Sequence, residues 1–187
     1  MSTLENSLIP LMKPMVLGES TVLDELHRRQ LAAWAVKTVM VSEGTRPSTV
    51  PRFYSSKDAK NPQLGLSLPE LTNIWLSRLS TSGLHMITAD LRLHAPIPER
   101  IIGCVSTIVV GELVFQVATL KGIDESFEGT VFVDSRPGDW DKLLVQIWPA
   151  DGDTLMWPPA MILSNDRSER SLTALQARWK PVVGSNL

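Results

Sequence analysis

The sequence has little of the chemistry on which metal and redox sites depend. Among its 187 residues there are one cysteine, Cys104, and three histidines. A single cysteine excludes a disulfide within the chain and a zinc site built from cysteine pairs, and it fits the reducing cytoplasm. The net charge of −2 gives no electrostatic case for a nucleic acid or an acidic membrane as the partner, although a local basic face stays open.

Long apolar runs and leader segments are also lacking. The most apolar stretches are shorter than the ~20 residues that a membrane-spanning helix needs. Charged residues and prolines, such as Glu5, Pro10 and Lys13, interrupt the first segment, so it does not read as a secretory signal. We therefore expect a cytoplasmic protein without a membrane partner.

The composition is that of a globular protein, with 43% hydrophobic and 20% charged residues. The order of the predicted elements, helices first and then antiparallel strands closed by a helix, indicates one α+β domain over residues 1–187. A helical part (1–44) is expected to pack on a mainly antiparallel sheet. A proline-rich connector (45–69) leads to the sheet and a C-terminal helix (70–187).

Two helices are predicted in the first part of the chain. The spacing of Ser2 and Glu5 is that of a capping box, which predicts a helix up to Gly18, bent or restarted at Pro10 and Pro14. Residues 21–44 are rich in helix formers and predict a second, longer helix. It is apolar nearly all round from 31 to 41, which is typical of a helix buried in the domain or at an interface.

Strand patterns begin after the connector. Residues 69–80 fit either a short helix or the lead into a strand, and residues 84–94 alternate as a half-buried strand does. Two β-branched runs flank Gly111 and Glu112, which predicts a tight hairpin at the centre of the sheet. Further strands are expected at 130–133 and 143–148, and a helix at 168–179.

Few side chains suggest a site. Lys37, inside the apolar helix, is expected either to reach out to solvent or to pair with a carboxylate. Cys104 reads as a small buried hydrophobe, and His27 and His94 read as surface residues. The sequence contains no GxSxG, GxxxxGK[ST], GxGxxG or HExxH motif. We therefore expect no catalytic residue, metal or cofactor in this chain.

Two sets of residues are candidates for binding a partner. Trp34 and Lys37 lie on the long apolar helix, where tryptophan can supply an interface hot spot, although core packing explains the same residues. Arg167, Arg170 and Arg178 give a modest basic cluster near the C-terminus, which could contact phosphates.

Met1, Ser2, Leu4 and Glu5 fit a helix start of the form Met-Ser-x-Leu-Glu. Together with LAAWAVKTVMV, TIVVGELVFQV, VQIWP, WPP and LTALQARW, this start resembles the region that follows the nuclease motif in bacterial and phage HNH endonuclease-like proteins. The resemblance covers most of the chain. In those relatives a cysteine-bearing catalytic segment leads directly into this helix, so the resemblance implies an accessory region without the catalytic unit, which would lie before Met1.

Three functions follow from these observations. The first is a non-catalytic interaction module, in the setting of a phage or mobile element, that binds a protein, a nucleoprotein complex or a second copy of itself. The second is an accessory part of a metal-dependent DNA endonuclease whose catalytic unit lies on a preceding segment or another chain. The third is direct binding of nucleic acid.

Overall fold

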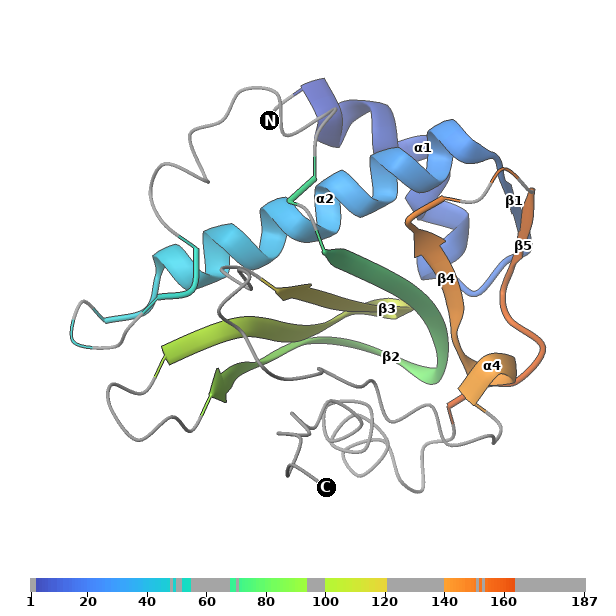
Figure 1. The fold of residues 1–187 in the computed structure, drawn as a ribbon. Helices are drawn as coiled ribbons and strands as arrows, with labels where there is room; N and C mark the ends of the chain where they lie inside the picture. Colours follow the sequence, from blue (N-terminus) through green and yellow to red (C-terminus); the bar gives the residue numbers. More distant parts are fainter. Residues whose placement is uncertain are drawn as a thin grey trace.

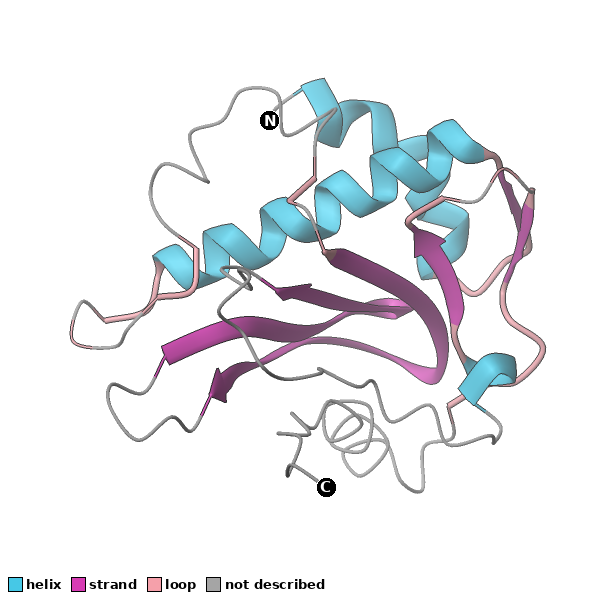
Figure 2. Ribbon diagram, in the orientation of Figure 1, coloured by secondary structure: helices cyan, strands magenta, loops and turns pink. Residues whose placement is uncertain are grey.

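A computed structural model describes residues 3–47, 49, 52–54, 68–69, 71–93, 100–120, 140–150, 152 and 154–163. They form an α+β fold, as the sequence predicts, with helix α2 along one face of a curved sheet and α1 beside it (Figures 1 and 2). The predicted strand at 130–133, the predicted C-terminal helix and Ser2 lie outside these ranges. The elements are α1 (Thr3–Val16), β1 (Thr21–Leu23), α2 (Glu25–Gly44), β2 (Thr72–Leu93), β3 (Arg100–Leu120), α4 (Trp140–Leu143), β4 (Val145–Trp148) and β5 (Leu155–Trp157).

Helix α1 is a single helix that runs through both of its prolines. Each proline removes one amide donor and so leaves free the carbonyl four residues earlier, at Asn6 and Pro10. Both of those residues are exposed, so water can reach the freed carbonyls. Of the two outcomes expected at the prolines, a bend or a restart, the restart does not occur.

Helix α2 confirms the clearest prediction from the sequence, with one change at its start. The Asp24 carboxylate accepts a hydrogen bond from the His27 amide at 2.8 Å and caps the helix, which begins at Glu25. The three residues expected to form its first turn are instead strand β1, which pairs with β5. The apolar segment is largely buried, as expected; its buried residues are Leu31, Ala32, Ala33, Ala35, Val36, Val39 and Met40.

The main sheet is antiparallel in the order β3-β2-β4, and β1 and β5 form a separate two-stranded ribbon. The segment that fitted either a helix or a strand is the start of β2. On the face toward α1 and α2, residues of β2 and β3 such as Ile74, Leu76 and Phe115 join the main core. A second buried cluster, which includes Val109, Val114 and Leu163, lies on the opposite face.

The predicted hairpin at Gly111 and Glu112 is not formed. Strand β3 continues through both residues and pairs with β2 on either side of them, with Gly111 opposite Gly83. Between Arg78 and Gly83 the register shifts, and Figure 1 shows that the two strands curve strongly together. We call this place, Arg78–Gly83 with Gly111 and Glu112, the sheet bend.

A tertiary contact explains why glycine is needed at the sheet bend. Gly111 has a φ of +61°, and a Cβ at this position would overlap the side chain and the carbonyl oxygen of Val16, at the end of α1. Its sequence neighbourhood fits a turn, but the glycine instead lets a helix end approach the strand backbone closely.

We predict that Gly111→Ala destabilises the fold more than a left-handed backbone alone explains. Gly152 has a φ of +76°, and no atom of the described residues lies within 4 Å of a Cβ added there, so Gly152→Ala is the matched control. The control should lose about 1–2 kcal/mol from its φ, whereas Gly111→Ala should lose about 3 kcal/mol or more because overlap is added. Urea unfolding measures both; equal losses would contradict the role assigned to the Val16 contact.

Candidate interaction surface

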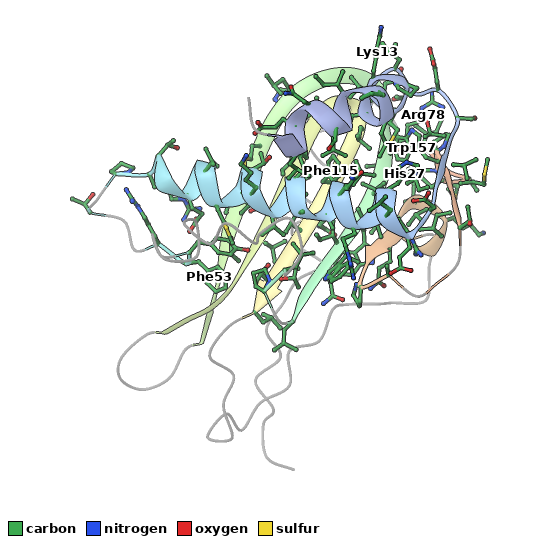
Figure 3. All side chains as sticks on the ribbon, turned by 90° about the horizontal axis from the view of Figure 1, so that it is seen from above. Lys13, His27, Phe53, Arg78, Phe115 and Trp157 are labelled. Atoms are coloured by element: carbon green, nitrogen blue, oxygen red, sulfur yellow. The ribbon has the colours of Figure 1, made fainter. Side chains whose placement is uncertain are left out.

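Lys37 and Trp34, the two predicted site residues on α2, contact α1 and β3. The Lys37 ammonium donates to the Glu5 carboxylate at 2.9 Å, and both side chains are 33% exposed. The pairing links α2 to α1, so of the two alternatives for Lys37 the structure shows the carboxylate partner, whereas the sequence favoured a side chain that reaches out to solvent. The Trp34 ring lies 5.2 Å from the ring of Phe115 on β3, tilted by 46°. Figure 3 labels Phe115 between α1 and α2. A partner-binding role for Trp34 and Lys37 stays a prediction.

The basic cluster of Arg167, Arg170 and Arg178 lies outside the described residues, as does His94. A phosphate-contacting role for the three arginines therefore also stays a prediction.

The remaining candidates for chemistry lie apart from one another. Cys104 is buried, as expected, with its sulfur 3.7 Å from the Ser106 hydroxyl. The His27 ring nitrogen Nδ1 lies 3.2 Å from the Asp24 carboxylate at the start of α2, whereas His85 is exposed on β2. Among the residues that the structure describes, no group of three or more His, Cys, Asp or Glu side chains is arranged to hold a metal ion. No helix in these ranges is long and apolar enough to cross a membrane.

A buried carboxylate, Glu43, was not singled out by the sequence, where it reads as an ordinary polar residue near a helix end. Its Oε2 accepts the amide of Phe53 at 2.8 Å, with the Tyr54 amide at 3.5 Å, and its Oε1 pairs with Arg46 at 2.8 Å. Tyr54 is itself buried in the main core. Glu43 therefore anchors the start of the connector to the end of α2.

The β1–β5 ribbon has exposed apolar side chains on one of its faces. In the β1–β5 ribbon, Leu23 and Trp157 are buried on the inner face. Val22 and Met156 are register partners, so they stand side by side on the outer face. Their residues are 54% and 60% exposed, and Leu26, in the first turn of α2, is 60% exposed. We call Val22, Leu26 and Met156 the ribbon patch.

Sequence reasoning missed the ribbon patch because it assigned residues 21–23 to a helix. Nothing local pairs Val22 with Met156, which lies far along the chain. Only the ribbon brings them together.

Comparisons with protein-family models, with curated proteins and with solved structures find no match to this chain. The resemblance to HNH endonuclease-like proteins therefore rests on the short sequence motifs that carry it.

We predict that Glu43→Ala lowers the free energy of unfolding by about 2–3 kcal/mol, because buried amide donors of the connector lose their acceptor. Glu43→Gln keeps an acceptor oxygen of the same reach but not the charge that pairs with Arg46. It should lose about half as much, since hydrogen bonds to charged groups are the stronger ones. Chemical denaturation of the two variants checks this order, and the reverse order would contradict the anchoring role of Glu43.

Proposed function

We propose that this chain is a non-catalytic interaction module that binds a partner protein through the ribbon patch. The observation that carries the proposal is the exposed cross-strand pair of Val22 and Met156, with Leu26 in the adjoining helix turn. Val22 and Met156 are neighbours across the ribbon, and neighbouring exposed apolar side chains mark interaction sites more often than isolated ones do. Covering each of them is worth roughly 25 cal/mol per Å² of apolar surface removed from water.

The rigidity of the ribbon supports this use. Behind the patch, Leu23 and Trp157 are buried in the main core, and Asp24 caps the helix that follows β1. The outer side chains are therefore carried on a fixed backbone, which lowers the entropy that binding must overcome.

The sequence resemblance adds a setting to the proposal. It favours a protein derived from an HNH-endonuclease-associated region, of phage or mobile-element type, that acts on a partner complex. The same resemblance makes an accessory role in a metal-dependent DNA endonuclease the alternative.

A triple variant, Val22→Thr, Leu26→Gln and Met156→Gln, tests the ribbon patch. We predict that it loses the partner at least tenfold while its stability changes by no more than about 1.5 kcal/mol, because all three side chains are exposed. Val41→Gln with Leu84→Gln is the matched control, since Val41 is 58% and Leu84 79% exposed at other places in the fold. The wild type and both variants carry the same affinity tag and are expressed in cells of the native source. The amount of each partner protein recovered with each of them is then measured.

Retention of every partner by the triple variant would contradict the proposal. So would cleavage of plasmid DNA by the purified chain alone in Mg²⁺ or Mn²⁺, because that activity belongs to a complete nuclease. Cleavage that appears only when a separate HNH-bearing chain is added would favour the alternative.

A further inference from the structure

We infer that the ribbon patch takes an extended, cationic segment of its partner protein, in which an apolar residue is flanked by lysine or arginine. This inference rests on the proposed function and adds the chemistry of the occupant. It comes from the charges that border the patch and from the strand geometry beneath it.

Exposed carboxylates flank the patch residues in the sequence. Asp24 continues the extended backbone of β1, with φ −77° and ψ 178°, and therefore stands on the same side as Val22 two residues earlier. Glu19, just before β1, and Glu25, beside Leu26, are exposed as well. Three exposed acidic residues, Glu19, Asp24 and Glu25, thus lie within three positions of Val22 or Leu26 along the chain.

Two cations in the first turns of α2 are held away from the exposed surface. Arg28 is fully buried, and the guanidinium of Arg29 lies 5.9 Å from the centre of the Trp148 ring, where it interacts with an aromatic face. Figure 3 shows Lys13 projecting from α1 away from Trp157 of the ribbon. His27, beside Asp24, is the one further titratable group in this turn of α2.

The negative charge near the patch determines which class of partner it favours. A phosphate backbone brought to the patch would meet carboxylates and be repelled, whereas lysine or arginine side chains would be attracted. An apolar contact bordered by opposite charges is the arrangement that combines affinity with correct placement. The occupant is therefore a cationic protein segment and not DNA or RNA.

The strand geometry sets the spacing of that segment. Among the described residues, β1 and β5 pair only with each other, and a peptide strand added beside either of them would continue the same alternation of side chains. Side chains on one face of a strand recur at every second position. We therefore expect the pattern basic-x-apolar-x-basic, with the apolar residue on the ribbon patch and the basic residues toward the carboxylates.

A peptide library provides the test without a known ligand. A displayed library of random peptides of about twelve residues is selected on the wild-type chain and counter-selected on the triple variant of the ribbon patch. The expected outcome is enrichment of the basic-x-apolar-x-basic pattern among peptides that bind only the wild type.

A selected peptide is then synthesised and its affinity measured with the double variant Glu19→Gln and Glu25→Gln. Asp24 is left unchanged because it caps α2. Affinity should fall about threefold to tenfold at low salt, the range of two exposed ion pairs, and the difference should shrink as salt screens it. The control pair Val41→Gln and Leu84→Gln should bind as the wild type does.

Each other result overturns the inference. If the peptides that need the ribbon patch are uncharged or acidic, the claim that the partner segment is cationic is wrong, but the proposed function still holds. If no selected peptide needs the ribbon patch, the claim that an extended segment binds there is wrong. Partner recovery with the triple variant tests the proposed function separately. Self-association that is lost in the triple variant would identify a second copy of the chain as the occupant.

Discussion

The close approach of the end of α1 to the sheet bend is the contact on which the other parts of the fold depend. Gly111 lets Val16 reach the backbone of β3, and Gly18, at φ +74°, lies directly over the ion pair of Arg78 and Glu112. The Arg78 carbonyl also accepts the Leu163 amide at 2.8 Å. One point of β2 is thus joined to a helix end, to β3 and to the segment that follows β5. These contacts help to position the ribbon, because β1 follows Gly18 and β5 precedes Leu163 closely in the chain.

The ion pairs in this arrangement specify positions more than they supply stability. In the pair of Arg78 and Glu112 the side chains are about a quarter exposed, and the pair of Lys37 and Glu5 is more exposed still. Pairs of this kind contribute about 0–1 kcal/mol each. More of the stability comes from the apolar cluster that unites α1, α2, the sheet and the ribbon through Met15, Val36, Phe115 and Trp157. The charges determine which part of a helix faces which part of the sheet, and the cluster holds the helix there.

The parts of the fold that the sequence predicts well are those set by local patterns. The helix formers of α2 and the strand predicted at 143–148, which forms over Val145–Trp148 after α4 ends at Leu143, depend on residues close together in the chain. The hairpin prediction failed because glycine and glutamate between two β-branched runs satisfy turn chemistry equally well, and Val16, which decides between the two, is remote. The pairing of Lys37 could be expected only as an alternative, since its partner Glu5 sits on another helix. The ribbon patch could not be predicted from the sequence, because Val22 and Met156 are exposed only as a result of Leu23 and Trp157 being buried on the opposite face of the ribbon.

The inner face of the ribbon supplies its stability, which bears on why its outer face is apolar. Two strands of three residues each are too short to be stable by themselves. They hold because Leu23 and Trp157 are buried in the main core. Val22 and Met156 point away from that core, and a threonine at either place would satisfy the strand equally well. Folding thus requires apolar residues on one side of the ribbon only. The apolar side chains on the other side are therefore not explained by the stability of the ribbon, and the proposed contact with another protein would account for them.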